Sequence, residues 1–253
     1  MNIILITGAS SGLGQEFALQ IDKSFFNIDE IWLLARREER LKDLAKKMYH
    51  KTRILPMDVT DQDHMRLLEL LLEEEKPRLC MLINCAGYGL LGAVADLDVK
   101  EQLGMLDTNC RALTQLTRLC LPYMRKNSRI INLASSAAFV PQPGFAVYAA
   151  TKSYVLSFST ALREELRPRG IWVTAVCPGP VRTEFFDIAE RYGKILGIKK
   201  FIMAEAKSVV ALALKDSYLK KTVSVYGLPM KAFRAVTKLL PHQMIIKITS
   251  SLK

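Results

Sequence analysis

Apolar and polar residues are arranged along this chain in two patterns. Continuous apolar runs predict buried strands at residues 2–7, 30–35, 52–57, 79–84, 129–134 and 171–176. Between these runs, apolar residues recur at helical spacing, which predicts helices from a glycine-rich turn to about Asp22 and over 38–49, 61–75, 99–126 and 148–167. Apolar strands separated by helices are typical of a parallel sheet covered on both faces, so the pattern predicts a doubly wound α/β fold.

One domain accounts for the whole pattern. The chain has 253 residues, and neither an internal repeat nor a low-complexity linker divides it. Half of the residues are hydrophobic, which supplies a large core and excludes general disorder. We therefore expect a single domain over 1–253, in which 184–203 forms a substrate lid and 228–253 a basic C-terminal extension.

The charge of the chain is positive and unevenly placed. Lys and Arg number 36 and Asp and Glu 25, which gives a net charge of +11. No acidic residue follows Asp216, so seven of the eleven net positive charges lie in the last 37 residues. A net positive charge of this size favours binding to phosphates, nucleic acid or an anionic membrane, but the sequence contains no nucleic-acid-binding motif. We favour docking of 228–253 on the body over membrane contact, because Pro229 and Pro241 interrupt any single long amphipathic helix.

The five cysteines form neither a metal-binding nor a disulfide pattern. They include no CxxC pair and no histidine at metal spacing, so we expect no metal site and interpret them as reduced thiols. The sequence also shows no signal-peptide pattern and no apolar run of the roughly 18 residues that span a membrane. These observations predict a cytoplasmic protein.

A glycine-rich turn joins the first predicted strand to the first helix. It reads Thr7-Gly8-Ala9-Ser10-Ser11-Gly12-Leu13-Gly14, a GxxxGxG spacing rather than the commoner GxGxxG. Such glycines let the backbone turn sharply and approach a pyrophosphate, and the helix N-terminus that follows offers free N–H groups. The alternative is a glycine-rich turn without a ligand, which the position of the turn makes the weaker interpretation.

The end of the second strand carries information about the nucleotide. An acidic residue there would bind the ribose 2′-hydroxyl of NAD, but this chain has Ala35 followed by Arg36 and Arg37. A guanidinium matches a 2′-phosphate through two parallel hydrogen bonds, which favours NADP. The alternative is that the two arginines only begin a solvated helix.

Three residues for proton transfer are expected at the same sheet edge. Tyr148 and Lys152 are four residues apart on one helix, and Ser135 closes the fifth strand. A neighbouring ammonium favours the phenolate and lowers the tyrosine pKa, so that the phenol can exchange a proton with a carbonyl oxygen held by the serine. A Tyr–Lys pair taken alone is usually structural, and it becomes specific only together with the glycine-rich turn and the serine.

Together these motifs resemble the classical short-chain dehydrogenase/reductase family over about residues 2–227. The family's TGxxxGxG turn falls on 7–14, its YxxxK on 148–152, its NNAG, with one change, on 84–87 and its PG motif on 178–183. The resemblance implies a Rossmann fold with a seven-stranded parallel sheet in the order 3-2-1-4-5-6-7 and helices on both faces. It also implies an enzyme that oxidises or reduces alcohol and carbonyl groups with NAD(P).

The resemblance assigns roles to individual residues. It implies a catalytic tetrad of Asn109, Ser135, Tyr148 and Lys152, in which Asn109 helps to hold a water that links Lys152 to solvent. Asp58 occupies the family position that contacts the adenine, and Arg36 matches the basic residue of NADP-preferring members. The cofactor-binding residues that it implies are Gly8, Ser10, Ser11, Gly12, Leu13, Gly14, Arg36, Arg37, Asp58, Val59, Asn84, Ala86, Gly87, Tyr148, Lys152, Pro178, Gly179, Val181 and Thr183.

The chain departs from the family pattern after its last strand. Many members end there with a glycine pair and an acidic residue, whereas here 223–226 is followed by Gly227 and 26 more residues. This tail resembles a branch related to ketosteroid and ketoacyl reductases. It argues against the common tetramer contact through the last strand, and we expect a homo-oligomer, either a dimer or a tetramer.

Two segments, 138–146 and 184–203, are expected to flank the substrate. Their large apolar residues indicate either a lid over an apolar ligand or a loop packed against the body. These residues are Phe139, Phe145, Phe185, Phe186, Ile188, Ile195, Leu196 and Phe201. We expect Lys194, Lys199 and Lys200 to be solvated, the alternative being contact with a carboxylate or phosphate of the substrate.

We therefore predict an oxidoreductase that interconverts a secondary alcohol and a ketone by hydride transfer. NADP is favoured over NAD as cofactor, and an apolar ketone such as a steroid or a bile acid is favoured as substrate. The alternatives are a 3-ketoacyl thioester reductase, a non-catalytic NADPH-binding sensor, and a membrane-surface protein held by its basic tail. The intact tetrad argues against a sensor, which has no need of all four residues.

Overall fold

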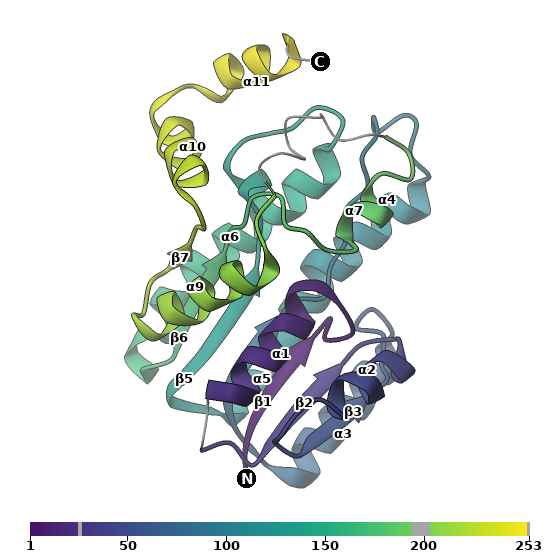
Figure 1. The fold of residues 1–253 in the computed structure, drawn as a ribbon, viewed down its shortest axis with the longest axis vertical. Coiled ribbons are helices and arrows are strands. Elements are labelled where there is room, and N and C mark those ends of the chain that lie inside the picture. Colours follow the sequence, from purple (N-terminus) through teal and green to yellow (C-terminus); the bar gives the residue numbers. More distant parts are fainter. Residues whose placement is uncertain (25–26, 194–202, 252–253) are drawn as a thin grey trace.

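The described part of the chain forms a seven-stranded parallel sheet with helices on both faces (Figure 1). The computed structural model describes residues 1–24, 27–193 and 203–251. The strand order is β3-β2-β1-β4-β5-β6-β7, so the predicted doubly wound fold and its topology are confirmed. The strands are β1 Asn2–Thr7, β2 Glu30–Leu34, β3 Thr52–Leu55, β4 Arg78–Asn84, β5 Met124–Leu133, β6 Trp172–Val176 and β7 Val223–Ser224.

The helices cover the sheet in two layers. Apolar side chains of α1, α2 and α9 pack on one face, and those of α3, α5 and α6 pack on the other. The helices are α1 Gly12–Ser24, α2 Glu38–Ala45, α3 Gln62–Glu75, α4 Val99–Leu106, α5 Leu113–Cys120, α6 Ala146–Leu166, α7 Phe185–Ala189, α9 Ala206–Tyr218, α10 Leu228–Leu239 and α11 His242–Ser251.

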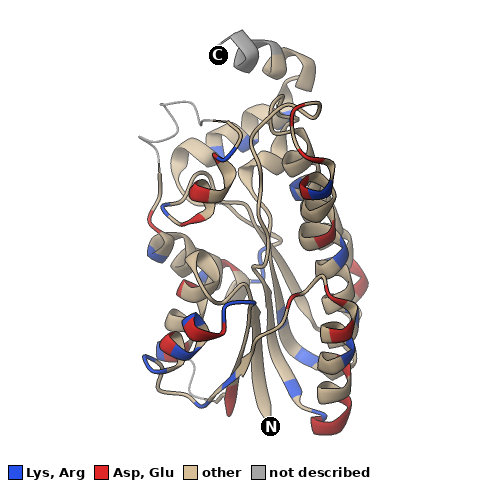
Figure 2. Cartoon of the chain, turned by 90° about the vertical axis from the view of Figure 1, so that its right-hand side faces the viewer, with Lys and Arg blue, Asp and Glu red and all other residues tan. Residues whose placement is uncertain are grey.

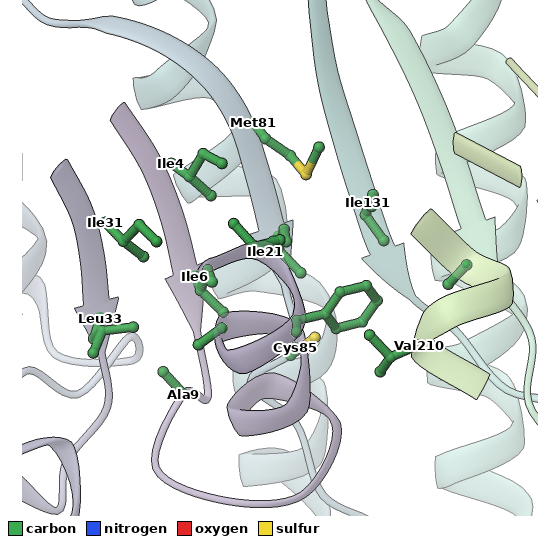
Figure 3. Close-up of a cluster of buried hydrophobic side chains, with 14 of the residues drawn as sticks. Ile4, Ile6, Ala9, Ile21, Ile31, Leu33, Met81, Cys85, Ile131 and Val210 are labelled. Carbon is green, nitrogen blue, oxygen red and sulfur yellow. The ribbon is translucent and has the colours of Figure 1, made fainter. Parts of the chain in front are cut away.

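The central strand β1 shows why its sequence is apolar without a break. Side chains alternate between the two faces of a strand. Ile4 and Ile6 therefore enter the core beneath α1 and α9 (Figure 3), whereas Ile3 and Leu5 enter the core on the opposite face. All four are fully buried. A strand that is covered on both sides needs apolar residues at every position.

Residues 99–126 do not form the single helix that their periodicity predicts. α4 is followed by a π-helical segment over Asp107–Ala112, and the chain then returns to α-helix in α5. A 3-10 turn over Leu121–Tyr123 ends the helix, and β5 begins at Met124, ahead of the predicted strand at 129–134. Pro122 has no backbone N–H and therefore cannot continue the helical ladder. The π-helical turn spans only Asp107–Ala112, and the sequence pattern does not reveal it because apolar residues recur at helical spacing on both sides of it.

A buried chain of polar side chains connects two central strands with α6. Nδ2 of Asn84 on β4 donates to Oδ1 of Asn132 on β5 at 2.8 Å, and Nδ2 of Asn132 donates to Oγ of Ser159 on α6 at 2.9 Å. Ser159 in turn donates to the carbonyl oxygen of Val155 at 2.6 Å. Asn132 and Ser159 are fully buried. The network holds the carboxyl ends of β4 and β5 against the helix that carries Tyr148.

None of the helices in the described ranges is long and apolar enough to cross a membrane. The described residues also contain no group of three or more His, Cys, Asp or Glu side chains that could hold a metal ion.

The buried amide of Asn132 predicts a measurable loss of stability on truncation. Asn132→Ala removes the nearer acceptor of the buried Asn84 amide and the donor to Ser159, so we expect the free energy of unfolding to fall by about 2–3 kcal/mol. Thermal melting should then shift down by roughly 5–10 °C. The control is Gln115→Ala, which removes an exposed amide that is hydrogen-bonded to Gln62 and should change stability by less than about 0.5 kcal/mol. If both variants melt at the same temperature as the wild type, the network does not stabilise the fold.

Candidate active site

The residues expected to bind a nucleotide and to transfer a proton meet in one cavity of about 600 Å³. The cavity lies at the carboxyl ends of the strands and is walled by the segments that follow β1 to β6. This is where open parallel sheets bind ligands, because the turns at that edge lie side by side. Every predicted site residue except Asn84 and Asn109 lines the cavity.

One side of the cavity is a backbone cradle formed by Gly8, Gly14 and Ala86. Gly8 has a φ of +66°, and a Cβ there would lie 2.8 Å from the backbone nitrogen of Ala86 in the turn after β4. Oγ1 of Thr7 accepts hydrogen bonds of 3.1 Å from the N–H groups of Cys85 and Ala86. A Cβ on Gly14 would overlap the carbonyl group of Gly8, so α1 begins directly against the turn. A helix N-terminus at a narrow backbone cradle suits a phosphate group.

Arg37 holds the glycine-rich turn to the segment that follows β6. Its Nη2 donates to Oγ of Ser10 at 3.2 Å and to Oγ of Ser11 at 2.7 Å, and its Nη1 donates to the carboxylate of Glu184 at 3.0 Å. Arg40 also donates to Glu184. The hydrogen bonds from Arg40, which has the larger effect, and from Arg37 hold the pKa of the Glu184 carboxyl below its ordinary value. Arg37 therefore already has partners on both sides.

Arg36 stands at the mouth of the cavity and is held more loosely. Its side chain is 77% exposed, and its Nη1 lies 3.7 Å from Oδ2 of Asp58. Oδ1 of Asp58 accepts hydrogen bonds from the N–H and the hydroxyl of Thr60, which orients the carboxylate. Of the two arginines predicted to bind a 2′-phosphate, Arg36 is thus the more exposed, and Arg37 already has partners in Ser10, Ser11 and Glu184.

Tyr148 is buried at the meeting point of the polar and apolar sides. Its hydroxyl lies near Ser135, and its ring stacks on Phe145 at 4.3 Å between centroids and contacts Phe185 at 5.4 Å. Burial raises the pKa of Tyr148 to about 12, against the smaller opposite effect of the Ser135 hydroxyl. Oγ of Ser135 also accepts from the N–H of Ala137, which orients the serine.

Lys152 lies one helical turn from Tyr148 and is also buried. Its Nζ donates to the carbonyl oxygen of Leu133 at 2.8 Å and lies 5.6 Å from the centroid of the Tyr148 ring. Burial lowers the pKa of Lys152 to about 8. The expectation that this ammonium lowers the tyrosine pKa is wrong for the protein chain alone, because desolvation of the phenolate is the larger effect.

Asn109 is placed next to Lys152 by the π-helical segment. Its Oδ1 accepts from the N–H of Tyr88 at 3.1 Å, and its Nδ2 donates to the carbonyl oxygen of Tyr88 at 2.9 Å and to Oγ1 of Thr151 at 3.0 Å. Both Asn109 Oδ1 and Lys152 Nζ lie against Gly87. Asn109 is thus part of the site although it does not line the cavity.

Asn84 was expected among the cofactor-binding residues, but its side chain points away from the cavity. It is buried and donates to Asn132 and to Thr117. Its neighbours Ala86 and Gly87 line the cavity instead. Asn84 therefore fixes the strand that carries this turn.

The other side of the cavity is an apolar wall. The segments predicted to flank the substrate contribute to it, but Phe139 packs outside, against Phe233 at 6.4 Å between ring centroids. Ile195, Leu196, Phe201 and the three lysines of the predicted lid lie outside the described residues. The wall consists of Leu91, Val140, Pro141, Phe145, Phe185, Phe186, Ile188, Met230 and Phe233.

Two wall residues, Met230 and Phe233, were missed by the sequence motifs. They lie on α10, more than 45 residues beyond the PG motif, where no motif marks them. The only sequence signal that bears on them is the expectation that residues 228–253 dock on the body. Ala204 lies beside the PG motif, because its N–H donates to the carbonyl oxygen of Pro180 at 2.9 Å and its carbonyl oxygen accepts from the N–H of Arg182 at 3.0 Å.

Comparison with known proteins also relates this chain to oxidoreductases. The family described as short chain dehydrogenase matches residues 2–191. Sulfoacetaldehyde reductase 2 of Chromohalobacter salexigens is 36% identical over 190 residues, which cover 73% of this chain and 74% of that protein. The NADP-dependent 3-hydroxy acid dehydrogenase of Schizosaccharomyces pombe is 35% identical over 189 residues, or 72% of each chain. A short-chain dehydrogenase of Sphingobium yanoikuyae, solved in complex with NADPH, has a TM-score of 0.79 at 28% identity over 94% of each chain.

The family match begins at β1 and ends just beyond α7, so it contains the glycine-rich turn, Asn109, Ser135, Tyr148 and Lys152. Relatives of this similarity are named reductases and dehydrogenases. The sheet order, the position of the motifs along it and the extent of the match agree, and the chain belongs to the short-chain dehydrogenase family of oxidoreductases, which act on alcohol and carbonyl groups with NAD(P).

Proposed function

We propose that this protein interconverts an apolar ketone and its secondary alcohol with NADP as the hydride carrier. The observation that supports this most directly is the position of Ser135, Tyr148 and Lys152 between a cradle suited to phosphates and an apolar wall. The ketone of a steroid or a bile acid has the required chemistry. A cytoplasmic location and a homo-oligomeric state stay predictions.

The polar side of the cavity fits NADP better than NAD. The cradle and the N-terminus of α1 suit a pyrophosphate, and Arg36 is exposed beside Asp58, where a 2′-phosphate would require a cation. Ala35 stands in place of the acid that would bind a 2′-hydroxyl. When bound, the nucleotide supplies or accepts the hydride.

Tyr148 is the group proposed to move the proton. With a pKa raised to about 12, its hydroxyl is protonated at neutral pH and donates to a carbonyl oxygen as negative charge develops there. The Ser135 hydroxyl holds the same oxygen. Lys152, with a pKa of about 8, stabilises the phenolate and exchanges its own proton near neutral pH. Asn109 is hydrogen-bonded to Thr151, the neighbour of Lys152, and so helps to position this part of α6.

The charge of the cavity wall bears on the substrate. Among the described lining residues, the cations are Arg36, Arg37 and Lys152, and none of these belongs to the apolar wall. Sulfoacetaldehyde and 3-hydroxy acids carry an anionic group, which a binding site commonly pairs with a cation. The apolar wall therefore favours a substrate whose ketone end is uncharged over the anionic substrates named for those two relatives.

A small hydroxy acid is the second candidate substrate, and it rests on the names of the relatives. A 3-ketoacyl thioester is also compatible with the apolar wall, since its acyl chain is apolar. A non-catalytic NADPH sensor is the weakest alternative, because Tyr148 and Lys152 are both buried and lie one helical turn apart at the cavity, which Ser135 also lines.

The test of the substrate class measures NADPH oxidation with a 3-ketosteroid, a medium-chain 3-ketoacyl thioester, sulfoacetaldehyde and a 3-keto acid. We expect kcat/KM for one of the two apolar ketones to exceed both anionic substrates by about tenfold or more, because only the apolar ketones fill the apolar wall. A preference for sulfoacetaldehyde or the keto acid would instead establish the second candidate.

Tyr148→Phe tests the mechanism, whichever substrate is active. The variant keeps the ring and its stacking on Phe145 but has no transferable proton, so kcat should fall by about 10²–10⁴-fold. NADPH binding, followed by nucleotide fluorescence, should stay within about twofold of the wild type, since the cradle is untouched. Near-normal turnover by this variant would rule out Tyr148 as the proton donor.

Arg36→Ala tests cofactor choice. A charge-assisted contact of about 1.5–3 kcal/mol would be lost with NADPH alone, so the preference for NADPH over NADH should drop roughly ten- to a hundredfold. The control is Arg66→Ala, which removes an exposed arginine on α3, away from the cavity. A wild-type enzyme that already prefers NADH contradicts the proposal without any variant.

Lys152 makes stability depend on pH in a defined direction. Its pKa is about 8 in the folded chain and near 10.5 when unfolded, so between these values the unfolded chain binds more protons. Wild-type stability should therefore rise with pH between about 8 and 10.5. Below pH 8, folding buries a charged ammonium at a cost of about 3 kcal/mol.

Lys152→Met removes that cost. Without nucleotide, the Tm of this variant should therefore exceed the Tm of the wild type by the largest margin below pH 8. The gain should shrink as the pH rises through 10.5, because above that value the wild-type lysine is neutral in both the folded and the unfolded chain. Lys100→Met, which removes an exposed lysine, supplies the reference curve. A Tm difference for Lys152→Met that does not change with pH would show that the lysine is not buried in its charged form.

A further inference from the structure

Helix α10, the last but one in the chain, has two apolar faces. Its inner face is Met230, Phe233 and Thr237, which pack toward the body. Met230 lies against Gly179, and Phe233 lies against Phe139. Figure 1 shows α10 and α11 as the last two helices, beyond the sheet layers at the cavity end. The expectation that the tail docks on the body thus has a counterpart in this inner face.

The opposite side of α10 is also apolar, but it faces solvent. We call Leu228, Ala232, Ala235, Val236 and Leu239 the outer face. These positions recur at helical spacing and form one stripe along the helix. Leu228 is 81% exposed, Val236 44% and Leu239 82%. A core helix needs only one apolar stripe, so the second stripe requires its own explanation.

Basic residues border the outer face along one side. Lys231 and Lys238 are seven residues apart, on the same side of the helix, and both are exposed. Arg234 lies between them, with its guanidinium over the Phe139 ring. No acidic residue follows Asp216, and Figure 2 shows the acidic residues on the other elements of the fold. An apolar stripe bordered by lysines and free of acids is the pattern of an interfacial helix.

We propose that α10 binds an anionic membrane surface through its outer face. The leucines and Val236 enter the apolar boundary, and Lys231 and Lys238 meet the headgroup phosphates. A second copy of this chain is disfavoured as the occupant. A symmetric contact through the outer face would bring like-charged lysines of both copies together, with no acidic residue on either tail to pair with them.

This contact would place the substrate side of the cavity next to the bilayer. The same helix that presents Leu239 outward contributes Met230 and Phe233 to the apolar wall. If the proposed function holds, an apolar ketone dissolved in the membrane has a short path to the cavity. The membrane proposal itself does not depend on the reaction, because binding to vesicles is measured without substrate.

Flotation of the full chain with vesicles tests the proposal. We expect the protein to float with vesicles of phosphatidylcholine and phosphatidylglycerol, and to remain in the dense fraction with phosphatidylcholine alone. Raising the salt to about 0.5 M should weaken binding, since the lysine contribution is screened. Absence of binding to the anionic vesicles at low salt overturns the proposal.

Single substitutions separate the two contributions. Leu239→Glu should lower the partition coefficient roughly ten- to a hundredfold, and Lys238→Gln about fivefold. Matched controls are Leu67→Glu on the exposed side of α3 and Lys215→Gln on α9, which should float like the wild type. Because Leu239 is exposed, the Leu239→Glu variant should keep the wild-type Tm and NADPH affinity, which excludes misfolding as the cause.

Sedimentation velocity without lipid tests whether a second copy of this chain, rather than a membrane, binds the outer face. We expect Leu239→Glu and the wild type to have the same oligomeric state. If Leu239→Glu instead dissociates an oligomer while vesicle binding is unchanged, the outer face is a subunit contact and the membrane proposal is wrong. Unchanged flotation of Leu239→Glu with the anionic vesicles also overturns it.

Discussion

The close approach of the turns after β1 and β4 is the constraint on which the rest of the site depends. Gly8 lies against the backbone of Ala86, and Thr7 fastens the two turns with hydrogen bonds to the N–H groups of Cys85 and Ala86. Parallel strands bring such turns to one edge, but only side chains as small as these let them touch. The contact leaves a narrow polar cradle beside a wider apolar wall.

Burial sets the chemistry of the group between these two sides. Desolvation raises the pKa of Tyr148 and lowers that of Lys152, so the neutral form of each residue is favoured. A neutral phenol near a lysine that titrates close to neutral pH suits the reversible transfer of one proton. The buried network of Asn84, Asn132 and Ser159 holds the strands and helix in register without taking part in the reaction.

The two sides of α10 connect the substrate wall to the exterior. Met230 and Phe233 face the cavity, and Leu239 faces solvent on the same helix. A helix with one apolar face inside and another outside stabilises the fold and still leaves a surface for binding. In the membrane proposal, the concentration of positive charge after Asp216 has a physical role, because it favours an anionic surface over a second copy of the chain.

The apolar periodicity by itself predicted six strands of the parallel sheet and the helices between them, because buried strands need apolar residues at every position, whereas the seventh strand came from the family resemblance. The spacing of the glycines, Ser135, Tyr148 and Lys152 likewise determined which residues meet, since strand ends share one edge. Only tertiary structure decided that Asn84 points into the core, that Arg37 is bound to Glu184 and that Met230 lines the cavity. It also decided the sign of the tyrosine pKa shift. Each of these depends on contacts and desolvation between segments far apart in the chain, which no local pattern records.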